Sequence, residues 1–256
     1  MSSVSALADR LRSGTPVLSA WCGIPEPTVA GLLAREGFDA VTLDMQHGAV
    51  DIATALRAVP LVAAAGKPAL VRVPVGEFAT ASRILDAGAS AVIAPMINTV
   101  EDARRFASFM KYPPLGERSW GPHGALGLTG LQPADYLANA NGFAVSLAMI
   151  ETREALSLVE EILAVPGLDG IFLGPSDLSI ALSNGAGIDP HMAEVDHALD
   201  HAFGRARAAG KVVGVYAATG ERASQFLKKG FDFVSVASDM ALLRTGAQAV
   251  LKAARA

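Results

Sequence analysis

Short apolar segments recur along the chain, and alanine-rich, helix-like segments separate them. Eight apolar segments end in Gly, Pro or a polar residue: TPVLSAW (15–21), AVTLDM (40–45), PALVRVP (68–74), AVIAPM (91–96), AVSLAMIE (144–151), GIFLG (170–174), VVGVYA (212–217) and FVSVAS (233–238). Such nearly continuous apolar strands are typical of a parallel sheet that helices cover on both faces. The pattern therefore predicts eight strand–helix units.

Eight units in 256 residues favour an α/β fold of the (β/α)8 TIM-barrel type. A doubly wound open sheet is the alternative, but no glycine fingerprint follows the first strand. No linker composition divides the chain, so we expect one barrel domain over residues 1–256. The Gly- and Pro-rich segment from Lys111 to Gly142 interrupts the alternation. A segment of that length predicts a functional loop or an oligomer contact.

Composition narrows the classes of function. Apolar residues make up 51% of the chain and charged residues 18%, which is enough apolar surface for a large core. The net charge of −4 and the lack of a Lys/Arg cluster argue against binding to nucleic acid or to an anionic membrane. The single cysteine, Cys22, excludes an internal disulfide. No membrane span or signal peptide is evident, so we expect a cytoplasmic protein.

Polar and aromatic residues gather where the predicted strands end. In barrel enzymes the active site is built at the carboxyl ends of the strands. The candidate site residues there are Trp21, His47, Arg72, Glu151, Gly174, Ser176, Asp177 and Tyr216, and Asp86 ends the helix before the fourth strand. Each of these residues alone is also explained by a structural role, such as an ion pair, a helix cap or aromatic packing.

The joint pattern is more specific than any one residue. Glu151 and Asp177 follow adjacent strands, so both carboxylates can reach one divalent cation such as Mg²⁺ or Mn²⁺. The turn GPSDL (174–178) offers backbone N–H groups to an anion, and Arg72 can stabilise an oxyanion. This combination predicts chemistry on a 2-oxo acid, whose C3 proton a metal would acidify.

Six segments, in this order and at similar spacing, resemble the HpcH/HpaI family of metal-dependent pyruvate aldolases, of the class II 4-hydroxy-2-oxoheptanedioate aldolase type. They are LDMQHG, PALVRVP, LDAGASAVIAPM, YPPLGERSWGP, MIET and IFLGPSDLS. The resemblance extends over nearly the whole chain. It implies reversible cleavage of a 4-hydroxy-2-oxo acid to pyruvate, or a close 2-oxo acid such as hydroxypyruvate, and an aldehyde. It also implies a Mg²⁺, Mn²⁺ or Co²⁺ cofactor.

The resemblance assigns roles to the candidate residues. Glu151 and Asp177 would hold the metal, and the backbone N–H of Ser176 would hold the pyruvate carboxylate. His47 would be part of the base that forms the enolate, with Asp86 raising its basicity. Arg72 would take the enolate charge. The family also implies that the last helix is exchanged between partners in a homo-oligomer, a hexamer built as a trimer of dimers.

Three departures from the family pattern bear on specificity. Gln46 stands where the family often has Glu, Met149 replaces a glutamine that commonly binds substrate, and Ser119 replaces a glycine after Arg118. The metal and base residues match, so the reaction class is unaffected. Because Met149 cannot donate a hydrogen bond, we expect this departure to affect which oxo acid and which aldehyde the protein accepts.

Two other functions compete with an aldolase. A lyase acting on acyl-CoA thioesters would be expected to carry an additional basic surface and an extension, and the sequence has neither. A catalytically silent barrel kept as a scaffold would be expected to have lost one of the four principal site residues, and all four are present: His47, Arg72, Glu151 and Asp177. For the aldehyde end, Tyr216 follows the seventh strand and either lines the aldehyde pocket or packs at the rim.

Overall fold

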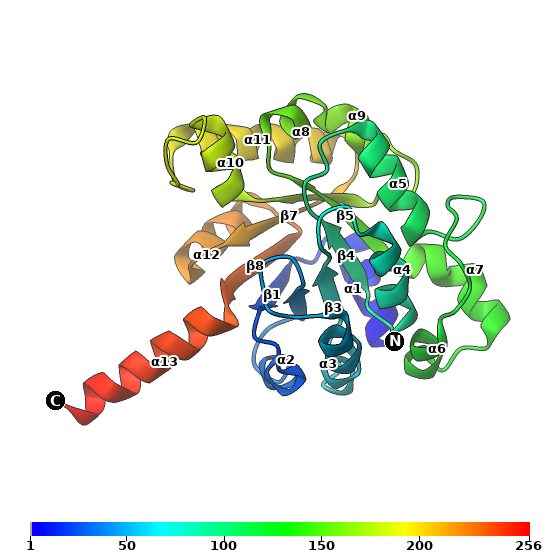
Figure 1. Ribbon diagram of the computed structural model, residues 1–256, viewed down its shortest axis with the longest axis horizontal. Coiled ribbons are helices and arrows are strands. Elements are labelled where there is room, and N and C mark those ends of the chain that lie inside the picture. The colour runs from blue at the N-terminus through cyan, green and yellow to red at the C-terminus, as the bar shows by residue number, and fades with distance from the viewer. Residues whose placement is uncertain (1) are drawn as a thin grey trace.

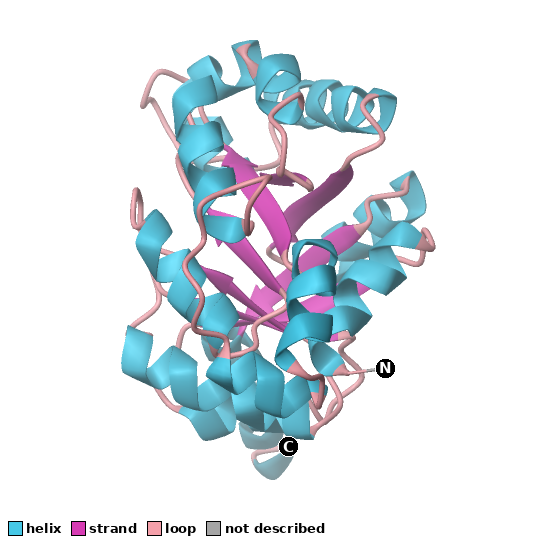
Figure 2. Ribbon diagram, turned by 90° about the vertical axis from the view of Figure 1, so that its right-hand side faces the viewer, coloured by secondary structure: helices cyan, strands magenta, loops and turns pink. Residues whose placement is uncertain are grey.

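The computed structural model describes residues 2–256 and contains a closed barrel of eight parallel strands in sequence order (Figures 1 and 2). The strands are β1 (Val17–Cys22), β2 (Ala40–Asp44), β3 (Ala69–Arg72), β4 (Ala91–Ala94), β5 (Val145–Ile150), β6 (Gly170–Leu173), β7 (Val212–Ala217) and β8 (Phe233–Ser238). The barrel closes where β8 pairs with β1. The predicted (β/α)8 architecture is confirmed, and each predicted strand matches one observed strand.

Helices surround the barrel in Figures 1 and 2. They are α1 (Ser3–Arg12), α2 (Pro27–Leu33), α3 (Ile52–Ala64), α4 (Phe78–Asp86), α5 (Val100–Met110), α6 (His123–Thr129), α7 (Pro133–Phe143), α8 (Arg153–Ser157), α9 (Val159–Leu163), α10 (Pro175–Leu182), α11 (Ala193–Ala208), α12 (Gly220–Lys229) and α13 (Asp239–Ala254). Over residues 2–256, none of them has the length and apolar character that a membrane crossing requires.

The core has two parts, one inside the barrel and one between the strands and the helices. Inside, side chains from different strands fill the barrel, among them Leu70, Ile93 and Phe233. Leu7 and Leu11 of α1 join this cluster beside Val17 and Val145, the first residues of β1 and β5. Because α1 covers the amino ends of the strands, the opposite, carboxyl ends are left for a site.

The segment from Lys111 to Gly142 is helical over much of its length, which corrects the expectation of a long loop. It contains α6 and most of α7. Lys111 is buried and its ammonium donates to the Asp169 carboxylate at 2.7 Å, which anchors the start of the segment. Its many Gly and Pro residues concealed the two helices. A role in function or in oligomer contacts stays a prediction.

Helix α13 extends away from the barrel (Figure 1). Asp239 is its one buried residue, and the helix exposes large apolar side chains, which are Met240, Leu243, Val250 and Leu251. The Asp239 carboxylate accepts hydrogen bonds from the backbone N–H groups of Gly23 and Ile24, so the first turn of α13 is tied to the loop after β1. Exchange of this helix between subunits stays a prediction.

Candidate active site

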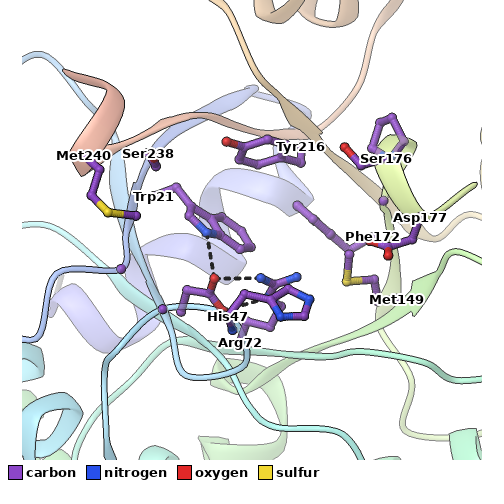
Figure 3. A pocket seen from close by; sticks show the side chains of 15 residues that line it. Trp21, His47, Arg72, Met149, Phe172, Ser176, Asp177, Tyr216, Ser238 and Met240 are labelled. Carbon is purple, nitrogen blue, oxygen red and sulfur yellow. Dashed lines mark hydrogen bonds and ion pairs between the residues drawn. The ribbon is translucent and has the colours of Figure 1, made fainter. Parts of the chain in front are cut away.

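A cavity of about 250 Å³ opens at the carboxyl ends of the strands (Figure 3). Seven of the predicted site residues line it: Trp21, His47, Arg72, Gly174, Ser176, Asp177 and Tyr216. They come from five different strands or from the loops that follow them, because parallel strands deliver their last residues to one rim. The fold therefore gathers residues that lie up to 195 positions apart, Trp21 and Tyr216.

Two glycines let the loop after β2 approach the loop after β1. A Cβ on Gly48 would lie 2.7 Å from the Cα of Gly23, closer than real side-chain carbons come to a backbone atom. The backbone N–H of Ala49 donates to the Gly23 carbonyl at 2.9 Å, which fixes the two loops together. His47 directly precedes this contact, and it lines the same cavity as Arg72 (Figure 3). The glycine contact thus positions the histidine at the mouth.

A β-bulge shapes the rim on the other side. Ala20 pairs with Val236 but Trp21 pairs with Ser238, so β8 has one extra residue at this point. The extra residue, Ala237, has a left-handed backbone with φ 49°. Bulges next to active sites redirect side chains. Here the bulge precedes Ser238, which lines the cavity and caps α13.

Asp44 is the principal site residue that the sequence analysis missed. It ends β2, is 4% exposed and accepts Arg72 at both carboxylate oxygens, from Nε at 2.8 Å and from a terminal nitrogen at 2.7 Å. The indole N–H of Trp21 donates to the same carboxylate at 3.2 Å. Backbone N–H groups of Gln46 and His47 donate to it as well. A buried aspartate three residues before the histidine is the signal that could have identified it.

The contacts of Asp44 determine its charge. Burial raises the pKa of the Asp44 carboxyl group, but the hydrogen bonds and charge of Arg72, with the backbone N–H groups of His47 and Gln46, outweigh it and leave the pKa below its ordinary value. Asp44 is thus an ionised anchor with its oxygens occupied. The Arg72 guanidinium, held in this way, also lies 4.8 Å from the centre of the Trp21 ring.

An aromatic wall forms part of the lining. The Trp21 ring stacks on Phe172 with 5.9 Å between ring centres and meets Tyr216 edge-on at 5.4 Å. Burial raises the pKa of the Tyr216 hydroxyl, so it is a neutral hydrogen-bonding group at neutral pH. Met149 is 3% exposed and lines the same cavity. Met149, which stands where the family commonly has a glutamine, is therefore part of the cavity wall.

Glu151 follows β5 and is 2% exposed. It lies directly behind Gly174, where an added Cβ would come within 2.8 Å of its Oε2. Its Oε1 accepts the backbone N–H of Met96 at 2.8 Å, and Met96 has the strained φ of 53°. Burial, together with the charge of Asp177 and a hydrogen bond to it, raises the pKa of Glu151 to about 7, although the Met96 N–H and Arg72 act in the opposite direction.

The residues present fit a divalent cation held by two carboxylates. Glu151 is buried and Asp177 is half-buried, and two such neighbouring carboxylates repel each other unless a cation or a proton lies between them. Their oxygen ligands suit a hard cation, with further positions open for water or for substrate oxygens. Within residues 2–256, no three His, Cys, Asp or Glu side chains gather as a larger ligand set.

Two predicted residues are not among those that line the cavity: Glu151, which lies against Gly174 of the lining, and Asp86, which lies apart from it. Asp86 ends α4, and barrel helices run back toward the amino ends of the strands, away from His47. Its carboxylate accepts a hydrogen bond from the buried Arg118 at 2.7 Å. Along the described part of the chain no hydrogen bond joins it to His47. The predicted pair of His47 and Asp86 is therefore not formed inside one chain.

Fold and rim together define a (β/α)8 barrel with a candidate active site at the carboxyl ends of its strands. A model of the HpcH/HpaI aldolase/citrate lyase family matches residues 19–245, and the chain belongs to this family. The resemblance seen in the sequence is thus confirmed.

Individual relatives refine the family assignment. The chain is 42% identical over 243 residues to hydroxypyruvate/pyruvate aldolase of Rhizorhabdus wittichii, an alignment that covers 95% of this chain and 96% of that protein. It is 35% identical over 246 residues to 4-hydroxy-2-oxo-heptane-1,7-dioate aldolase of Salmonella dublin, with 96% and 93% covered. The crystal structure of a family member from Burkholderia cenocepacia matches with a TM-score of 0.87 and 28% identity, over 98% of this chain and 100% of that one. The predicted class, a lyase of the aldolase type, agrees with these relatives.

Proposed function

We propose that the protein is a divalent-metal-dependent aldolase that reversibly cleaves a 4-hydroxy-2-oxo acid to pyruvate, or a close 2-oxo acid such as hydroxypyruvate, and an aldehyde. One observation carries this proposal. The buried carboxylate of Glu151 and the half-buried carboxylate of Asp177 interact at the same barrel mouth as an arginine that Asp44 holds in place. The names of the two curated relatives, which act on hydroxypyruvate, pyruvate or a 4-hydroxy-2-oxo acid, support the reaction class.

Glu151 and Asp177 would hold the metal ion, which we propose to be Mg²⁺, Mn²⁺ or Co²⁺. When bound there, such an ion would supply positive charge that polarises the 2-oxo group and acidifies the protons at C3. Asp177 lies in the first turn of α10, and the side chain of the next residue, Leu178, is buried in the core. Both ligands are therefore fixed by the barrel rather than by a mobile loop.

Arg72 and Ser176 would bind the oxyanions of the substrate. The guanidinium of Arg72 is preorganised by Asp44, so it can stabilise the charge that develops on oxygen without first reorienting. The backbone N–H of Ser176, in the first turn of α10, has no partner within the helix and would donate a hydrogen bond to the substrate carboxylate. Pro175 at the first helical position contributes no N–H.

The bond changes assign a proton to His47. In cleavage the C4 hydroxyl gives its proton to solvent water, the C3–C4 bond breaks, and its electron pair stays on C3 as the pyruvate enolate while the aldehyde leaves. A proton delivered to C3 then completes pyruvate. His47 at the mouth would deliver this proton and, in synthesis, remove it, because imidazole titrates near neutral pH.

We also propose that the protein is a homo-oligomer, a hexamer built as a trimer of dimers, in which α13 packs on a partner chain. The apolar side chains exposed along α13, Leu243, Val250 and Leu251, support this proposal, because an isolated helix with such a face gains stability by burying it. A cytoplasmic location is proposed from the single cysteine, Cys22, which is buried and unpaired.

The test is release of pyruvate from a panel of 4-hydroxy-2-oxo acids, before and after exhaustive chelation and after re-addition of each metal. We expect activity to disappear with chelation and to return with at least one of the three ions. Full activity in the chelated enzyme would overturn the metal-dependent proposal. A panel in which no compound releases pyruvate would overturn the aldolase itself.

A further inference from the structure

The cavity holds one permanently charged cation among the residues that line it, and this cation is already paired. Its charged lining residues are Asp44, Arg72 and Asp177, with His47 as the one imidazole. Both of the nitrogens by which Arg72 contacts Asp44 lie within 2.8 Å of a carboxylate oxygen. The lining therefore offers no uncommitted positive charge to a second carboxylate on the substrate.

The nearest side cavity does not supply such a charge. This smaller cavity shares Pro175, Ser176 and Tyr216 with the first and is also lined by Arg222. The Arg222 guanidinium is bound to the Asp196 carboxylate and donates to the Gln225 side chain at 3.0 Å. It is thus neutralised where it stands, and the other basic residue of this lining, His191, carries an imidazole rather than a permanent charge.

The uncharged side chains that line the main cavity are mainly aromatic, thioether or hydroxyl in character. They include Trp21, Met149, Phe172, Tyr216, Ser238 and Met240. The faces of aromatic rings carry partial negative charge, which disfavours an anion lying against them. At about 250 Å³ the cavity is also below the roughly 300–1,000 Å³ of drug-sized ligand sites, so the ligand is small.

We propose that the aldehyde that this aldolase releases and accepts is short and uncharged. This inference rests on the proposed function and deepens it. Cleavage of a 4-hydroxy-2-oxo-heptane-1,7-dioate between C3 and C4 gives pyruvate and 4-oxobutanoate, whose carboxylate was C7. A carboxylate at that position would meet the aromatic and thioether walls with no free counter-charge, and a charge moved out of water without a partner is strongly disfavoured.

The first test compares matched aldehydes in the synthetic direction with pyruvate. The pair is 4-oxobutanoate and its methyl ester, which has the same carbon chain without the charge, and hexanal, whose chain is as long as that of the ester, controls for the bulk of the ester. We expect kcat/KM for each neutral aldehyde to exceed that for 4-oxobutanoate by about tenfold or more. An equal or higher value for 4-oxobutanoate would overturn the inference while leaving the aldolase intact. Reaction with none of the three would overturn the proposed function and this inference together.

The second test introduces a cation at the rim. Met240 lines the cavity and is 53% exposed, so Met240→Lys can place an ammonium there without burying it. We expect the ratio of kcat/KM for 4-oxobutanoate to that for the methyl ester to rise about three- to tenfold over the ratio for Met240→Gln, a neutral control of similar length. Thermal unfolding confirms that both variants fold. No difference between the two variants would contradict the assignment of this rim to the aldehyde.

Discussion

Asp44 receives Arg72 at both of its carboxylate oxygens while it also accepts the backbone N–H of His47. One buried side chain thereby fixes the relative positions of the proposed oxyanion-binding group and the proposed base. Arg72 is 6% exposed, so water does not compete for its hydrogen bonds to Asp44. The ion pair between Asp44 and Arg72 therefore orders the site before the substrate binds. Electrostatic stabilisation of a transition state is most effective when the charged groups are already in position.

Asp44→Asn is the direct test of this arrangement. The amide keeps the shape but loses the charge, and its NH2 group faces a guanidinium that also can only donate. We expect kcat for pyruvate release to fall by about 10²-fold or more, as when a preorganised donor is disturbed. Asp51→Asn is the matched control, since Asp51 is an exposed helix cap whose amide replacement still accepts from Thr54. Similar kinetics for the two variants would contradict a positioning role for Asp44.

The strand positions were predictable because they depend on hydrophobic periodicity, whereas the pairing of Asp44 with Arg72 was not. Asp44 ends an apolar strand and has no local feature that marks a partner 28 residues later in the chain. For Asp86, too, the sequence predicted the position but not the partner. Its place at the end of α4 was readable, but its actual partner, Arg118, depends on how the helical segment after Lys111 packs.

The buried Asp44 carboxylate should also make stability depend on pH. Its pKa in the folded protein lies below the ordinary value of 3.8, so its contribution to stability is fully present above that value. It is lost as the pH falls through the lowered pKa. Below about pH 4, the free energy of unfolding should therefore fall less steeply with decreasing pH in Asp44→Asn than in the wild type. Urea unfolding at a series of pH values measures the free energy of unfolding of both proteins. If that free energy fell equally with pH in both, the acid sensitivity would come from another group.

Gly48→Ala should disturb the mouth of the barrel. The added Cβ would lie 2.7 Å from the Cα of Gly23, and because both atoms are backbone-linked, one loop must move. We expect kcat/KM to fall at least about tenfold, together with a destabilisation of about 1–3 kcal/mol for the overpacked contact. Gly204→Ala in α11 is the control, because a Cβ there meets nothing within 4 Å. Wild-type kinetics in Gly48→Ala would show that the position of His47 tolerates the shift.

Glu151→Gln and Asp177→Asn test the proposed metal site without relying on turnover. Each change removes one of two carboxylates while keeping the side-chain volume, so calorimetric titration with Mn²⁺ should show metal affinity lower by about 10²-fold or more. Asp189→Asn, in the exposed loop after α10, is the matched control. Unchanged Mn²⁺ binding in both site variants would place the metal elsewhere. Circular dichroism checks that both variants retain the barrel. We expect them to, because neither carboxylate is part of the apolar core.

His47 is the residue whose proposed role can be separated most cleanly from metal and substrate binding. Its ring lies at the cavity mouth and its own backbone, not its imidazole, is held by Asp44. We expect His47→Ala to lower aldol turnover by the ~10²–10⁴-fold typical of a lost general base. Exchange of the pyruvate methyl protons with solvent deuterium, followed by NMR, should slow in parallel, because that exchange reports enolate formation without carbon–carbon bond making.

Oxaloacetate decarboxylation provides the internal control for the same variant. That reaction reaches the pyruvate enolate by loss of carbon dioxide, so no C–H proton has to be removed, and His47→Ala should impair it less than it impairs exchange. Mn²⁺ affinity should change little, because the imidazole is not among the proposed ligands. Proton exchange at the wild-type rate would assign the base to another group. His47 would then act by positioning the substrate at the mouth, and the glycine contact between Gly23 and Gly48 would serve that placement instead.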